Sequence, residues 1–135
     1  MMTLFDFIER DRNRILEWAA SLTKPDQARL QQKLDRLAQI SFDLANGSHL
    51  LAGPVAGHIY KLRVNASVML RPLLCKGPAR KEEEYTLLVG AIEKGNRLPS
   101  QALETAHTRL ELVEAAPSEF RRKHERIGTS TSKTV

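Results

Sequence analysis

The chain is poor in the features that stabilise secreted proteins or anchor membrane proteins. Its 135 residues include a single cysteine, Cys75, so no disulfide can form within the chain. Cys75 lies in an apolar run, which favours a core thiol over a nucleophile. No apolar run approaches the ~18 residues that cross a bilayer. Asp6, Glu9 and Asp11 stand where a signal peptide would be basic and then apolar. We therefore expect a cytoplasmic protein with no membrane partner.

The spacing of a metal site is also missing. His49 and His58 have no second histidine, cysteine or carboxylate at an interval typical of metal ligands, so no metal and no cofactor is expected. His58 lies beside cations at the start of an apolar run, which makes it a candidate for proton transfer or RNA contact, because a histidine titrates near neutral pH. A solvated loop histidine is the favoured alternative.

Positive charge is what the chain has in excess. Lysine and arginine number 21 against 16 aspartate and glutamate, giving a formal net charge of +5 and a sequence pI near 9.7. Such a balance favours a polyanionic partner but fixes neither the partner nor the fold. The length suits one domain with a substantial core and is too short for two.

Three short β-prone runs dominate the middle of the chain, at residues 58–64, 68–75 and 85–92. Polar breaks separate them, one at residues 65–67 and one that starts with Lys76, Gly77 and Pro78. Short apolar runs between turn formers are typical of consecutive antiparallel strands, so the pattern predicts a three-strand meander.

The first of these runs alternates in polarity, and strand side chains point to opposite faces with a period of two. One face is therefore predicted to be core and the other basic. A three-residue loop at 65–67 would place Val64 opposite Val68, Arg63 opposite Met69, and Lys61 opposite Arg71, with both arginines on one face. A two-residue turn would move Arg71 to the other face, and the sequence leaves both open. The predicted core face carries Tyr60, Leu62 and Val64, and the basic face carries Ile59, Lys61 and Arg63.

The flanking segments predict helices around this sheet. Residues 3–8 are a candidate first strand. Apolar positions with helical spacing then predict helices over 12–21 and 25–41, joined as a hairpin, and a closing helix that begins at Pro99. Residues 42–57 are rich in Asn, Gly, Ser and Pro and are expected to be irregular. The predicted fold is α+β, with a domain over 1–116 and a basic, partly disordered tail over 117–135.

Several of these segments, in this order, carry a family resemblance. They are Gly53-Pro54, Ile59-Tyr-Lys-Leu-Arg63, Leu70-Arg-Pro-Leu-Leu74, Leu87-Leu-Val-Gly-Ala-Ile92 and Leu98-Pro-Ser-Gln-Ala102. Together they resemble the RelE/ParE toxin superfamily, and within it the phage-derived Gp49-like and HigB-like branch. The resemblance covers about residues 3 to 113.

This resemblance implies a RelE-like fold and the toxin of a type II toxin–antitoxin pair, which cuts messenger RNA, commonly on the ribosome, and is neutralised by a small antitoxin. Attack of a ribose 2′-hydroxyl on the phosphodiester needs cations around the phosphate, and the planar fork of arginine suits that role. By position, Arg63, Arg71 and Lys94 are the catalytic candidates, with Arg71 either functional or bracing its strand. Lys61, Arg97 and His58 are the RNA-binding candidates.

The segment after the last strand departs from the family pattern. Glu93 replaces part of a basic run, and no tyrosine follows where some members use one. Fewer cations weaken phosphate affinity. Two alternatives therefore stay open: a ParE-like non-enzymatic inhibitor of DNA gyrase, and a catalytically degenerate phage-derived protein that keeps the fold and binds a partner.

Overall fold

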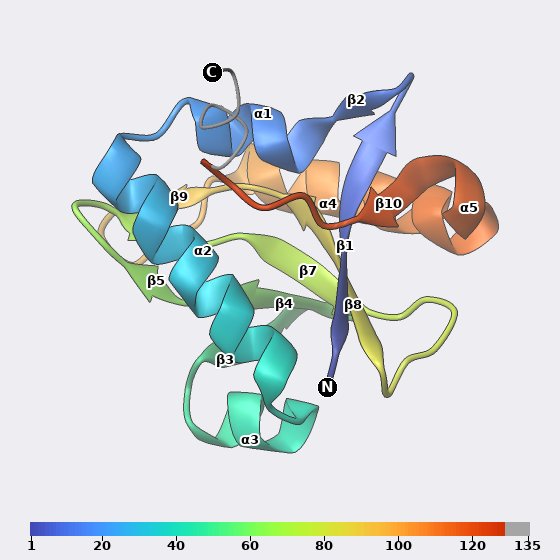
Figure 1. The fold of residues 1–135 in the computed structure, drawn as a ribbon, viewed down its shortest axis with the longest axis horizontal. Coiled ribbons are helices and arrows are strands. Elements are labelled where there is room, and N and C mark those ends of the chain that lie inside the picture. The colour runs from blue at the N-terminus through green and yellow to red at the C-terminus, as the bar shows by residue number, and fades with distance from the viewer. Residues whose placement is uncertain (129–135) are drawn as a thin grey trace, which may run out of the picture.

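The computed structural model describes residues 1–128 and shows an α+β fold in three layers, with a mixed sheet between helices (Figure 1). The main sheet has the strand order β10-β1-β8-β7-β4-β3. Its members are β1 (Thr3–Glu9), β3 (Leu51–Ala56), β4 (Ile59–Leu62), β7 (Leu73–Lys76), β8 (Glu84–Val89) and β10 (Arg121–Lys123), with the short β2 (Arg12–Asn13) paired to β1.

The predicted meander is present as β4, β7 and β8, which pair antiparallel in that order. The first strand, β1, lies inside the sheet, next to its edge strand β10: it pairs in parallel with β8 and antiparallel with β10. The segment predicted as a tail thus supplies β10 and the short helix α5 (Pro117–Phe120), while the rest of that tail, 129–135, lies outside the described residues.

Each strand of the meander is longer in the prediction than in the structure. The ends form a separate small sheet of β5 (Val64–Asn65), β6 (Met69–Leu70) and β9 (Ile92–Glu93). The second run breaks at Pro72, which has no N–H to donate to a ladder. The break lets the β5–β6 hairpin and β9 bend away from the main sheet.

The hairpin register, which the sequence left open, differs by two residues from the one that a three-residue loop would give. Val64 pairs with Leu70, and Lys61 pairs with Leu73 rather than with Arg71. Both Val64 and Leu70 are fully buried, so this register places two core side chains opposite each other, whereas Val68 is 37% exposed. A slip of two residues keeps every side chain on its predicted face.

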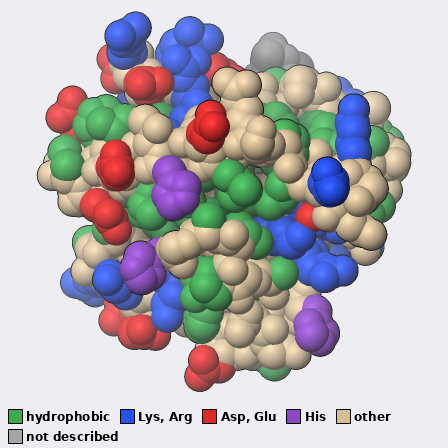
Figure 2. Space-filling model, turned by 180° about the vertical axis from the view of Figure 1, so that it is seen from behind, with side chains coloured by type: hydrophobic (Ala, Val, Ile, Leu, Met, Phe, Trp, Pro, Cys, Tyr) green, Lys and Arg blue, Asp and Glu red, His purple; other side chains and the backbone are tan. Residues whose placement is uncertain are grey.

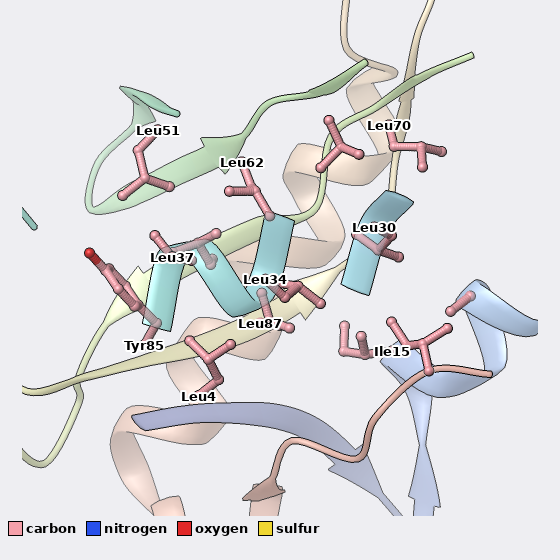
Figure 3. Close-up of a cluster of buried hydrophobic side chains, with 14 of the residues drawn as sticks. Leu4, Ile15, Leu30, Leu34, Leu37, Leu51, Leu62, Leu70, Tyr85 and Leu87 are labelled. Carbon is pink, nitrogen blue, oxygen red and sulfur yellow. The ribbon is translucent and has the colours of Figure 1, made fainter. Parts of the chain in front are cut away.

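The helical hairpin covers one face of the sheet, as predicted. α1 (Arg14–Ala20) is capped by Asn13, whose side-chain oxygen accepts a hydrogen bond from the Leu16 N–H at 2.8 Å. α2 (Lys24–Gln39) has Pro25 in its first turn, where a missing N–H costs nothing. Figure 3 shows the apolar stripe of α2 packed against leucines of the sheet: Leu30, Leu34 and Leu37 face Leu4, Leu62 and Leu87.

The closing helix, α4 (Ser100–Ala115), lies on the opposite face (Figure 1). Its stripe, Ala102, Ala106, Leu110 and Val113, packs against the sheet side chains Ile59, Leu73, Cys75 and Leu88. Ile59 stands on the face of β4 that the alternation predicts to be basic. That face is therefore a second core over much of its area, because α4 covers it.

The stretch 42–57, expected to be irregular, contains the helix α3 (Phe42–Gly47) and the edge strand β3. The Ser41 hydroxyl caps α3 by accepting from the Leu44 N–H at 3.1 Å, a short-range signal that the turn-rich composition hides. Within residues 1–128, no helix has the length and apolarity needed to cross a bilayer.

Candidate functional site

Two of the predicted catalytic and RNA-binding cations lie against a carboxylate. Arg71 donates from Nε to Glu93 at 3.0 Å, and the Lys61 ammonium donates to the other oxygen of the same carboxylate. Arg71 is 4% exposed and Glu93 is 8% exposed. We call Lys61, Arg71 and Glu93 the Glu93 cluster.

The rest of the Arg71 guanidinium is occupied by the chain around it. Nη1 donates to the carbonyl oxygen of Leu70 at 2.8 Å, and Nη2 donates to the Asn65 side chain at 3.2 Å. Burial acts to raise the pKa of Glu93, but the hydrogen bonds and positive charges of Lys61 and Arg71 outweigh it and hold that pKa below its ordinary range. A buried arginine that already faces a carboxylate and two polar oxygens braces its strands, and it has little left to offer a phosphate.

Arg63 is in a different environment. It is exposed at the end of β4 and lines an open hollow of about 330 Å³. We call this the basic hollow. Its lining is Lys33, Arg36, Ser48, His49, Leu50, Arg63 and Asn65, and none of these residues is acidic.

Three segments build the basic hollow. Its wall is α2, on which Lys33 and Arg36 stand three residues apart and therefore on one side of the helix. The backbone N–H of Arg63 donates to the Leu50 carbonyl at 2.9 Å, which ties the end of β4 to the loop before β3. His49, in that loop, has a φ of 67°, a left-handed conformation that turns the chain sharply after α3.

The remaining predicted residues are not gathered here. Lys94 and Arg97 are exposed in the turn after β9, where they form an isolated β-bridge with each other. His58 lines another hollow, together with Tyr60, Lys76 and Glu114. The structure thus joins Lys61 to Arg71, and leaves Arg63, His58 and the Lys94–Arg97 turn in three separate places. In Figure 2, lysine and arginine side chains gather on the right of the face seen from behind, around a small acidic spot.

Lys33, Arg36 and His49 are not among the site residues that the sequence predicts. Lys33 and Arg36 stand away from the apolar stripe of α2, a pattern typical of a solvated face. The signal that would have found them is the spacing of Arg29, Lys33 and Arg36, which puts three cations on one side of the helix. Only tertiary structure brings this side next to Arg63.

The chemistry of the hollow is that of an anion site. Arginine and lysine beside hydroxyl and amide groups suit a phosphate. No group of three or more His, Cys, Asp or Glu placed to hold a metal ion occurs in the described part of the chain.

Comparisons with protein-family models and with curated proteins find no match for the chain.

Proposed function

We propose that this protein is a RelE/ParE-like toxin that acts on messenger RNA as an endoribonuclease, with Arg63 in contact with the phosphate. The observation that carries the proposal is that Arg63 is exposed, free of any carboxylate partner within residues 1–128, and at the rim of a hollow without acidic residues. A free arginine fork there can hold two oxygens of a phosphodiester during attack by the neighbouring 2′-hydroxyl. The strand positions and sequence segments of the family resemblance support the same reading.

A second candidate is a catalytically degenerate relative that binds RNA or an antitoxin without cleaving. The Glu93 cluster favours it, because a carboxylate neutralises Lys61 and Arg71, two of the cations expected around the phosphate. Lys94, the third catalytic candidate, lies in the turn after β9 and not in the basic hollow.

An induction experiment in a bacterial host separates these readings. Growth and messenger integrity are followed for the wild type, for Arg63→Ala and for Lys123→Ala. The last is a matched control: it also removes one exposed cation, but from β10, four strand spacings or about 19 Å across the sheet from β4.

We expect the wild type to arrest growth and to fragment messenger RNA. Both effects should be lost in Arg63→Ala and kept in Lys123→Ala. Arrest with intact messenger and signs of DNA damage would replace the nuclease by a ParE-like gyrase inhibitor. Absence of arrest from soluble wild-type protein would favour the degenerate relative.

A further inference from the structure

We infer that the basic hollow and the adjoining side of α2 bind the phosphates of single-stranded RNA, so that RNA runs along α2 and not across the sheet face that the sequence indicates. This inference rests on the proposed function for the identity of the polyanion. The site itself follows from the charges, the shape and the neighbours of α2.

The cations of the basic hollow are not neutralised by ion pairs within residues 1–128. Lys33, Arg36 and Arg63 form no ion pair with any other residue of 1–128. The acidic residues of α2 face elsewhere: Asp26 accepts hydrogen bonds from the Ser67 backbone and hydroxyl, and Asp35 accepts from Arg126. The helix thus keeps its carboxylates engaged on other sides and leaves a side with cations alone.

Arg29 extends this cationic side by one further turn. Its guanidinium donates to the Asn65 carbonyl at 3.3 Å and to Gln32 at 3.0 Å, so it is held in place without meeting a carboxylate of residues 1–128. From Arg29 to Arg36 the helix rises about 10 Å. This length is enough to contact more than one phosphate of an extended RNA strand. The basic hollow lies at one end of it.

The shape of the hollow favours a single strand over a duplex. Its volume of about 330 Å³ admits a phosphate with its ribose, and Leu50 offers an apolar contact among the polar lining residues. The walls are α2 on one side and the turn that carries His49 on the other. A flexible single strand can bend a phosphate into such a recess, whereas the phosphates of a duplex lie on a rigid rod.

The test is binding of a fluorescent 2′-O-methyl oligouridylate of about ten nucleotides, followed by anisotropy at about 0.05 to 0.2 M salt. This probe has no free 2′-hydroxyl and cannot be cleaved, so binding is measured apart from nuclease activity. The proteins compared are the wild type, the double variant Lys33→Ala/Arg36→Ala and the control Lys81→Ala/Lys123→Ala. The control removes the same charge from exposed positions outside the hollow. All three should have the same circular dichroism spectrum and melting temperature.

Two lost contacts to a single strand should lower the slope of log K against log salt by about 1.4 in magnitude and weaken binding about 25-fold at 0.1 M salt. The control should keep the slope of the wild type. If both double variants lost the same affinity and the same salt dependence, the effect would be one of net charge, and the proposed site would be overturned. Wild-type protein that fails to bind, or that binds duplex DNA of the same length more tightly, would overturn the inference as well. Binding that depends on α2 in a protein without toxicity would uphold this site and count against the nuclease proposal.

Discussion

Replacing Glu93 by glutamine should destabilise the protein by about 3 kcal/mol, because it leaves a buried arginine without its counter-ion. Removing one partner of a buried ion pair costs about 3 to 5 kcal/mol. Two features of the structure place the cost of Glu93→Gln at the lower end of this range. Arg71 keeps its hydrogen bonds to the Leu70 carbonyl and the Asn65 side chain, and Lys61, whose side chain is 19% exposed, can turn toward water.

Urea denaturation followed by circular dichroism measures this loss. With a slope of about 2 kcal/mol/M, the midpoint should fall by about 1.5 M. Glu83→Gln is the matched control: its carboxylate is 66% exposed and pairs with Arg80, so its removal should change stability by less than about 1 kcal/mol. The double variant Arg71→Met/Glu93→Gln should be less destabilised than the sum of the two single changes. Two results together would show that the Glu93 cluster is not a buried ion network. Glu93→Gln would lower stability no more than Glu83→Gln does, and the stability losses of Arg71→Met and Glu93→Gln would simply add in the double variant.

The same cluster sets a dependence on pH. The pKa of Glu93 is lowered in the folded protein from its ordinary value of 4.5, since Lys61 and Arg71 outweigh the effect of burial. A lowered folded pKa means that the carboxylate contributes stability above the unfolded value, and that this contribution is lost as pH falls through the folded value. Wild-type protein should therefore lose stability in acid below about pH 4.5, and Glu93→Gln should lack that component of the loss.

Two further predictions concern the core. A Cβ added at Gly90 would lie 1.8 Å from Cδ2 of Trp18, so Gly90→Ala should lower stability by about 1 to 3 kcal/mol in thermal melts. The loss should shrink in a Trp18→Leu background, and an equal loss there would show that Trp18 is not the obstacle. Burial raises the pKa of the Cys75 thiol to about 12, so iodoacetamide at about pH 8 should label the unfolded chain but not the native one. Rapid native labelling would mean that the cover formed by α4 opens readily.

Local sequence patterns were sufficient to predict those helices and strands whose buried face is determined by their own residues. The stripe Leu30, Leu34 and Leu37 predicts α2, and the alternation of β4 predicts a strand with Leu62 in the core, because period and burial go together. The breaks in the meander and its register were beyond such patterns. They depend on Val64 meeting Leu70 across a hairpin and on Pro72 interrupting a ladder.

The candidate site was harder to predict because its charges are decided by long-range contacts. Sequence spacing finds Arg63 and Arg71 equally suitable. In the structure, Glu93 lies 22 residues beyond Arg71 and takes up its charge, while α2 brings Lys33 and Arg36 to Arg63 from an earlier part of the chain. No local pattern specifies which cation will meet a carboxylate and which will remain free.

The position of β1 between β10 and β8 has a consequence for synthesis on the ribosome. The strand is made first, yet Thr3 pairs with Glu84 and Phe5 pairs with Lys123, so along residues 3–7 its edges wait for partners made much later, while Ile8 and Glu9 pair early with β2. Until then a strand that carries Leu4, Phe7 and Ile8 has open hydrogen-bonding edges and uncovered apolar side chains. The nascent chain should therefore need protection by chaperones throughout elongation, and the sheet can close around its first strand only when almost all of residues 1–128 have been translated.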